Sequence, residues 1–338
     1  MGVRRCGHAA GMDILDSFHG SPFTAAMAME RGLSRDRLRD LLAHGLVRQP
    51  LHSVYVAAAE PDTLVLRAKA AALVLPEHAV VCDLCAAWLH GVDLLDFAEL
   101  DLVPRLDVVS TDGHEGSRRP EVFGGKRDLR ADEIMMVHGV RVTTPVRTVC
   151  DIARLRGRLR ALAALDEFRR VHGISEQELR AMLPRFVRHR GVIQLRELIP
   201  LSTDKADSQA ESWIRLIIHD AGLPLPEPQV WSLLPEWGRV RTENAYAHLR
   251  IAVEYDGEEF HTSEEDREHD RLRRDALRRA GWIVIVVRKD GLGEQARAVW
   301  LQELVAAMAS RAPADKAKRI YSRGPDHPSY RRRKARDR

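Results

Sequence analysis

Three acidic residues in the C-terminal third of the chain have the types and spacing of a divalent-cation site. Glu254 and Asp256 are separated by one residue in the segment IAVEYDG, so in a strand both side chains would lie on the same face. Carboxylates held this close repel each other and resist desolvation, and a bound cation removes that penalty. Glu243 precedes them and comes close if the two segments pair as a hairpin. The pattern predicts a site for Mg²⁺, or Mn²⁺, formed by Glu243, Glu254 and Asp256.

Such a site would support hydrolysis of a DNA phosphodiester. The metal would lower the pKa of a bound water and polarise a phosphoryl oxygen. His261, in the polar turn GEEFHT, could serve as general base or as acid to the leaving oxygen. Arg274, on the helix that follows, could neutralise charge in the transition state. The plainer interpretation is that the carboxylates and Arg274 are solvated and that His261 is an ordinary turn residue.

The elements that would hold these residues form an α/β unit with a mixed sheet. We expect a helix over 206–221, strands over 240–246 and 249–255, a helix over 263–280 and a buried strand over 282–287. Glu211 lies in the first helix. Leu272, Ala276, Leu277 and Ala280 form the predicted buried stripe of the second helix. A strand, a helix and a buried strand in that order predict a crossover with parallel pairing.

This segment, from Glu211 to Arg288, resembles the very-short-patch-repair-type endonucleases of the PD-(D/E)xK superfamily. The matching pieces are AESWIR, ENAYAHLRIAVEYDG, GEEFH and AGWIVIVV. The resemblance implies a restriction-endonuclease-like fold and a Mg²⁺-dependent DNA endonuclease. The family's functional positions would fall here on Glu211, Glu243, Glu254, Asp256, His261 and Arg274.

Two departures from the family pattern leave a second function open. Glu243 stands where the family usually has Asp, and the Lys of the wider superfamily motif is replaced by Asp256. Mg²⁺ requires near-octahedral geometry, so a side chain longer by one methylene could misplace it. The alternative is a non-catalytic, antitoxin-like DNA-binding regulator with a degenerate nuclease fold.

Residues 21–58 have the outline of a winged helix-turn-helix. The pattern predicts a helix over 23–30, the turn GLS at 32–34, a second helix over 35–43 and a β-ribbon over 46–56. In this fold the second helix enters the major groove, and we expect the ribbon to lie near phosphates. The alternative is a small helical domain with solvated arginines. The candidate DNA contacts are Arg35, Arg37, Arg39 and, on the ribbon, Arg48.

The same region and the one after it resemble a second family. Residues 22–56 are similar to the N-terminal domain of the abortive-infection type IV antitoxins. The motifs CAAWLHG at 85–91 and TTPVRTVCDIA at 143–153 resemble the segment that follows that domain, and a single strand is expected over 134–143. Cys82 and Cys85 form a CxxC motif, but zinc needs four ligands and no second pair is nearby, so a structural role is expected.

The length predicts two or three domains, and the helix and strand patterns predict an α+β multidomain protein. The expected domains are a flexible lead (1–20), a winged helix-turn-helix (21–58), an α/β antitoxin-like middle domain (59–200), an endonuclease-like domain (201–312) and a disordered basic tail (313–338). Four cysteines are too few for a disulfide scaffold, and no apolar run is long enough to span a membrane. With no signal-peptide pattern, a cytoplasmic protein is expected.

The expected tail differs in charge from the rest of the chain. It holds ten Lys/Arg and three Asp, a net charge of +7, whereas the whole chain has +4. Such a segment either binds phosphates without sequence preference or keeps the protein soluble. Its candidate DNA contacts are Arg331, Arg332, Arg333 and Lys334.

Overall fold

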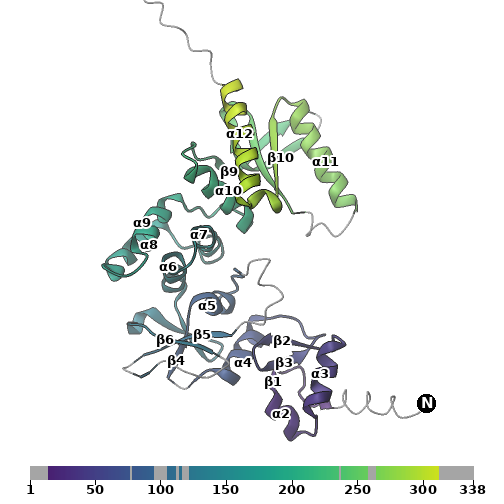
Figure 1. Cartoon of the computed structure of the whole chain (residues 1–338), viewed down its shortest axis with the longest axis vertical. Coiled ribbons are helices and arrows are strands. Elements are labelled where there is room, and N and C mark those ends of the chain that lie inside the picture. Colours follow the sequence, from purple (N-terminus) through teal and green to yellow (C-terminus); the bar gives the residue numbers. More distant parts are fainter. Residues whose placement is uncertain are drawn as a thin grey trace, which may run out of the picture. The chain divides into compact units, whose positions relative to one another are not determined.

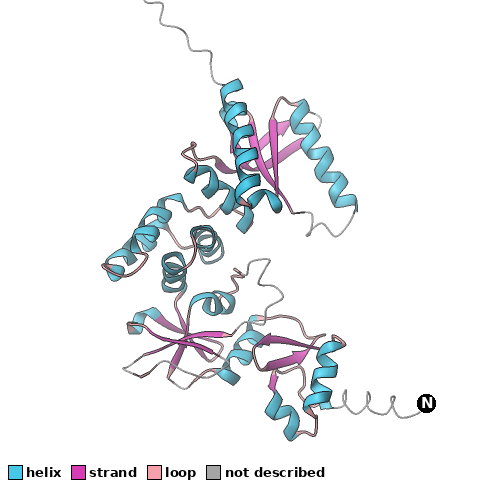
Figure 2. Cartoon of the chain, in the orientation of Figure 1, coloured by secondary structure: helices cyan, strands magenta, loops and turns pink. Residues whose placement is uncertain are grey.

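The computed structural model contains two compact units, one up to Gln229 and one from Val230. Both combine helices with sheets, which confirms the α+β class (Figure 1, Figure 2). Three sheets are present in the described part of the chain, with strand orders β1-β3-β2, β6-β5-β4-β8-β7 and β12-β11-β10-β9. The described residues are 14–76, 78–94, 105–111, 114–115, 122–235, 237–257 and 264–311.

The first sheet packs against two short helices near the N-terminus. The elements are β1 (Phe23–Thr24), α2 (Ala25–Glu30), α3 (Arg35–Ala43), β2 (Val47–Leu51) and β3 (Val54–Ala57). The helix predicted over 23–30 begins two residues later, because Phe23 and Thr24 pair with β3. Ser34 caps α3 by accepting a hydrogen bond from the Arg37 backbone N–H at 3.2 Å. Gly32 takes φ +89° in the turn between the helices, a conformation that glycine adopts without a steric penalty.

A five-stranded mixed sheet and two helices follow. The elements are α4 (Leu64–Val74), β4 (Ala79–Val81), α5 (Asp83–Leu89), β5 (Leu106–Ser110), β6 (Val122–Lys126), β7 (Ile134–Val137) and β8 (Val140–Thr143). The single strand expected over 134–143 is wrong: β7 and β8 form an antiparallel hairpin. His138 and Gly139 have φ values of +45° and +87° and reverse the chain between them.

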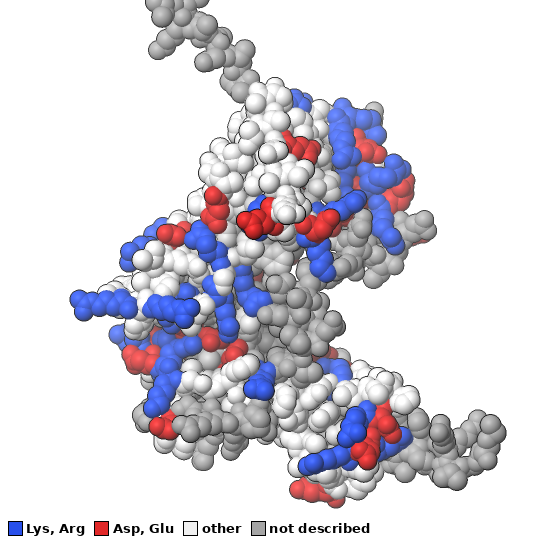
Figure 3. Space-filling view, in the orientation of Figure 1, with Lys and Arg blue, Asp and Glu red and all other residues white. Residues whose placement is uncertain are grey.

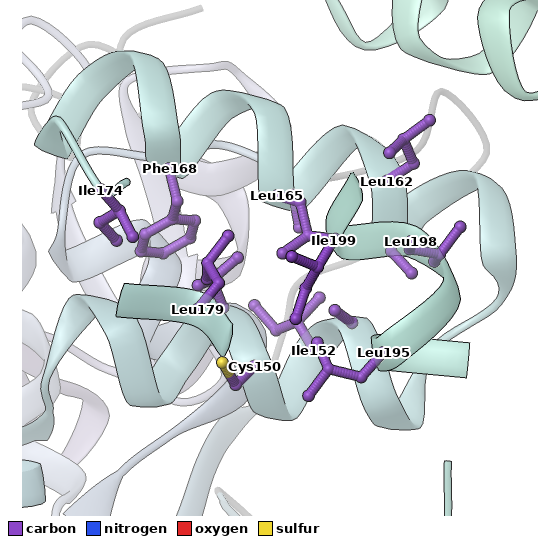
Figure 4. Close-up of a cluster of buried hydrophobic side chains, with 14 of the residues drawn as sticks. Cys150, Ile152, Leu162, Leu165, Phe168, Ile174, Leu179, Leu195, Leu198 and Ile199 are labelled. Carbon is purple, nitrogen blue, oxygen red and sulfur yellow. The ribbon is translucent and has the colours of Figure 1, made fainter. Parts of the chain in front are cut away.

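A helical bundle completes the first unit. It consists of α6 (Pro145–Leu155), α7 (Arg158–His172), α8 (Glu176–Met182), α9 (Val192–Leu198) and α10 (Gln209–Asp220). The apolar faces of these helices meet in one core, which includes Ile152, Leu165, Phe168, Leu179 and Leu195 (Figure 4). Burial of this continuous apolar surface holds the bundle together.

The second unit contains the hairpin, the helix and the strand expected over 240–287, and also β9 and α12, which were not predicted. Its elements are β9 (Glu227–Leu234, which begins before the boundary), β10 (Gly238–Tyr246), β11 (Ile251–Asp256), α11 (Glu264–Arg279), β12 (Ile283–Arg288) and α12 (Glu294–Arg311). The helix expected over 206–221 belongs to the first unit. β10 pairs antiparallel with β11, and β11 pairs parallel with β12. The predicted parallel pairing across a helical crossover is therefore confirmed. Ala276 and Leu277 of α11 pack on Ala252 and Val284 of the sheet, which α11 and α12 flank (Figure 1).

Among the described residues, every helix is too short or too polar to span a lipid bilayer.

Candidate functional site

Glu254 lies on β11 with its side chain fully buried, at 0% exposure, beneath α11. Arg273 of α11 neutralises it in a bidentate pair, with Nη1 donating to Oε1 at 2.9 Å and Nη2 to Oε2 at 2.8 Å. The Arg274 Nε lies 3.5 Å from the same Oε2 atom. Two planar, matched donors make this the strongest common form of ion pair.

Asp256 lies on the same face of β11, as the alternation of strand side chains predicts. Arg274 donates from Nη1 to its Oδ2 at 3.1 Å, and the Arg288 Nε is 3.6 Å from that oxygen. Asp256 borders a cavity of about 530 Å³ between α11 and α12 beside the edge strand β12. Its lining includes Arg271, Arg274, Arg278, Arg288, Trp300 and Glu303.

The carboxylate of Glu243 links β10 to β11 through a hydrogen bond. The described pairing of these strands ends at Asn244 opposite Val253. Beyond it, the Glu243 Oε2 atom accepts a hydrogen bond from the Tyr255 backbone N–H at 2.7 Å. The expectation that Glu243 comes close to β11 across the hairpin is therefore confirmed. Its carboxylate satisfies a strand N–H that would otherwise need a partner.

The arrangement of these carboxylates does not fit a magnesium ion. Within the described ranges, no group of three or more His, Cys, Asp or Glu side chains is placed to hold a metal. Both Glu254 oxygens accept hydrogen bonds from Arg273, and Asp256 pairs with Arg274. Guanidinium groups of α11 therefore relieve the repulsion that the spacing of Glu254 and Asp256 creates.

Arg273 is the member of this cluster that the sequence pattern missed. It precedes Ala276 by three residues and Leu277 by four, which places it on the buried face of α11. The predicted stripe put Leu272 there instead, but Leu272 is 39% exposed. The spacing to Ala276 and Leu277 was the signal that could have identified Arg273.

Two further residues belong to the predicted catalytic set, Glu211 and His261. Glu211 belongs to the first unit, where it is buried in the first turn of α10. It accepts hydrogen bonds from the Asp207 backbone N–H, the Ser208 hydroxyl and the Gln229 side-chain amide, while burial raises its pKa. These contacts are those of a helix-capping residue. His261 lies outside the described residues.

The four arginines predicted to contact DNA in the N-terminal region differ in exposure. Arg35 is exposed on α3, and the Arg39 side chain is 75% exposed although it pairs with Asp36 at 3.2 Å. Arg37 lies on the inner side of α3, with a side chain that is 20% exposed. Arg48 donates to the Glu60 backbone carbonyl at 3.2 Å. Arg35 and Arg39 are therefore the arginines of α3 that can meet a ligand without rearrangement.

The other candidate DNA contacts, Arg331, Arg332, Arg333 and Lys334, lie outside the described residues.

A buried ion-pair network joins the middle sheet to the helical bundle. Arg147 contacts Glu133 and Asp151, each at 2.7 Å, and Arg127 contacts Asp83 at 2.9 Å and Asp151 at 3.0 Å. The surrounding arginines hold the pKa of Asp151 below its usual range against the opposing effect of burial. Because each charge has partners, the network can hold α5, α6 and the 3-10 turn η2 (Ala131–Glu133), which precedes β7, in one arrangement.

The CxxC cysteines lie beside this network as free, buried thiols. The Cys85 Sγ atom lies 3.3 Å from the Arg105 carbonyl and accepts from the Asp107 N–H at 3.2 Å. Burial raises the pKa of both thiols well above its usual value. These are features of packed, unreactive cysteines.

Comparisons with known proteins match the middle region of the chain. Residues 79–201 match the family model of the AbiEi antitoxin C-terminal domain. This range contains both motifs, CAAWLHG and TTPVRTVCDIA, on which the antitoxin resemblance of the middle region rested. It includes the five-stranded sheet, the ion-pair network and α6 to α9. The resemblance of the middle region is therefore confirmed.

Two curated proteins cover most of the chain. They are the uncharacterized proteins MT2308 and Rv2248, from two strains of Mycobacterium tuberculosis. Each is 30% identical over 257 residues, which is 75% of this chain and 90% of the relative. The chain therefore belongs to the same protein family as MT2308 and Rv2248.

Proposed function

We propose that this protein is a DNA-binding regulator of the antitoxin type that does not cut the DNA it binds. The observation that carries the proposal is the exposed arginine pair of α3, on a helix–turn–helix with a β-ribbon, in a chain that matches an antitoxin domain at residues 79–201. The same arrangement supports the interpretation of residues 21–58 as a winged helix-turn-helix.

The geometry of α3 suits an approach to a DNA groove. Its inner face is fixed by Leu38 and Leu41, which are buried in the N-terminal core. Arg35 and Arg39 are four residues apart, so they project from one side of the helix. In a winged helix the second helix presents such side chains to base edges and phosphates. Each arginine that meets a phosphate displaces counterions and adds affinity that falls with salt.

Binding of a fluorescent DNA duplex by the intact chain tests this proposal. The duplex should carry the sequence directly upstream of the protein's own coding region. We expect Arg35→Ala with Arg39→Ala to weaken binding about tenfold or more and to reduce the slope of log affinity against log salt by about 2.

Arg180→Ala is the matched control. Arg180 is a half-exposed helix arginine that pairs with Glu176 four residues away. Removing it changes the charge of the chain by the same amount per residue, but α8 is not part of the proposed interface. Equal losses in Arg180→Ala and in each of the two α3 single variants, or no loss in the α3 double variant, would contradict the proposal.

Mg²⁺-dependent hydrolysis of DNA is the second candidate function. The order β10, β11, α11 and β12, with parallel pairing of the last two strands, favours it because this is the order that the endonuclease resemblance implies. The pairing of Glu254 and Asp256 with arginines argues against it. A nuclease would leave cut ends in Mg²⁺ or Mn²⁺, whereas a regulator would only retard the DNA.

A further inference from the structure

One face of β9 and β10 carries an exposed aromatic side chain. Trp231 is 54% exposed and Leu233, two residues along β9, is 79% exposed. β9 is the edge strand of the sheet, next to β10. Large apolar side chains that are exposed together on an edge strand form a candidate binding surface.

Two arginines of β10 lie over the Trp231 ring. The guanidinium carbon of Arg239 is 4.5 Å from the ring centroid and that of Arg241 is 5.7 Å from it. Arg239 and Arg241 are both exposed, while Val240 between them is buried. The alternation of strand side chains therefore places both arginines and the indole on one face of the sheet.

We infer that this face, formed by Trp231, Leu233, Arg239 and Arg241, binds a single-stranded nucleic acid segment by base stacking. An indole offers an aromatic surface to any base, and guanidinium groups both stack on bases and neutralise phosphates. A paired duplex cannot supply the ligand, since its bases are already stacked inside the helix. The strand must therefore be single or locally unpaired.

The charge of the face selects nucleic acid over an apolar protein partner. An apolar partner would have to desolvate Arg239 and Arg241, which costs free energy unless it supplies matching anions. A phosphate backbone supplies those anions at regular intervals along the strand, next to bases that can stack. The combination of a basic surface with an aromatic side chain is the usual composition of single-strand sites.

This inference goes beyond the proposed function. The regulator hypothesis depends on Arg35 and Arg39 in the first unit and on duplex DNA. The stacking face lies in the second unit and takes a different form of nucleic acid. Experiments can therefore contradict the regulator hypothesis or the stacking inference without contradicting the other.

The experiment measures fluorescence anisotropy of labelled oligothymidylate and oligouridylate with the full chain. We expect Trp231→Ala to weaken binding by about 5-fold to 100-fold, the range measured for loss of one stacked base. Because this substitution removes no charge, any contribution of the basic tail is unchanged. Trp231→Phe should retain most of the affinity, and Arg239→Ala with Arg241→Ala should weaken binding and its salt dependence.

The controls separate stacking from charge, folding and duplex binding. Arg271→Ala removes one exposed arginine of the same unit, and Arg35→Ala with Arg39→Ala removes the proposed duplex contacts. When Trp231→Ala is added to either of these variants, it should weaken single-strand binding by the same factor as in the unmodified chain. Circular dichroism should show that the Trp231→Ala variant is folded. A preference between the two oligonucleotides would distinguish DNA from RNA as the ligand.

Two results would overturn the inference. One is single-strand binding by the folded Trp231→Ala variant that equals that of the unmodified chain. The other is a Trp231→Ala variant that changes only the oligomeric state in light scattering, which would make the face a contact between two copies along the edge strand.

Discussion

At the scale of single residues, the second unit is organised by pairs between arginine and carboxylate. The spacing of Glu254 and Asp256 was enough to predict that they share a strand face, because alternation in a strand is local. The partners of these two carboxylates could not be predicted from the strand segment alone. Arg273 and Arg274 come from α11, and their contacts depend on how that helix packs on the sheet.

The Arg273–Glu254 pair is expected to be structural. Arg273→Leu leaves a fully buried carboxylate without its bidentate partner, and we expect the free energy of unfolding to fall by roughly 3 kcal/mol. The double variant Arg273→Leu with Glu254→Leu should recover most of that loss, since it removes the unpaired charge. Urea unfolding of the three proteins measures both effects. A single variant as stable as the unmodified chain would contradict the assigned role.

Asp107 predicts a pH dependence of stability. Burial, followed by the nearby Asp83, raises the pKa of Asp107 to about 6, although Leu84 and Cys85 backbone N–H groups donate to its carboxylate. The folded protein therefore holds this proton more tightly than the unfolded chain. The resulting stabilisation is complete below pH 4 and is lost as the pH rises through 6, by up to about 3 kcal/mol.

Asp107→Asn should remove that dependence. The amide stays neutral and its oxygen can still accept from the two N–H groups. We expect the variant to melt at a higher temperature than the unmodified chain at pH 8 and at nearly the same temperature at pH 4. Parallel melting curves in the two buffers test this. A variant that is less stable at pH 8 would show that the charge of Asp107, which lies 3.8 Å from Arg156, is stabilising.

At the scale of elements, local signals predicted most helices and strands. Ser34 begins α3 and the Ser175–Glu178 capping box begins α8, and both are capping patterns that the sequence alone carries. The hairpin at His138 and Gly139 was missed because the residues on both sides of this pair favour strands, although Gly139 permits a tight turn between them. Leu272 was misplaced because Arg273, a charged residue, takes the buried position through an ion pair. The burial of Arg273 depends on a contact that is distant in the sequence, whereas the β7–β8 hairpin is a local one.

Gly191 illustrates such a contact between elements. It precedes α9 with φ +79°, and a Cβ atom there would lie 1.8 Å from the Arg154 carbonyl oxygen of α6. We expect Gly191→Ala to cost roughly 3 kcal/mol or more, from the left-handed backbone and the clash together. Gly173→Ala is the control, since it has φ +65° but no atom within 4 Å, and about 1 kcal/mol is expected. Equal losses in thermal unfolding would rule out the close approach.

At the scale of the whole molecule, the chain combines a small N-terminal sheet with two short helices, a middle region that matches an antitoxin domain model and a C-terminal mixed sheet. In the last of these, the pairing of β10, β11 and β12 was predictable from apolar runs and turn residues along 240–287, whereas the edge strand β9 was not predicted. The chemistry of this sheet was not predictable, because two neighbouring carboxylates give the same sequence pattern whether a metal or an arginine neutralises them. The structure places arginines there.

The most direct test of the account is a comparison of binding and cleavage on one DNA. The intact chain is incubated with a labelled duplex from upstream of its coding region, in Mg²⁺ and in EDTA, and run on native and denaturing gels. A regulator that binds DNA without cutting it gives a retarded band in both buffers and unbroken strands in both. Absence of a retarded band, or strands broken in Mg²⁺ but intact in EDTA, would contradict this proposal.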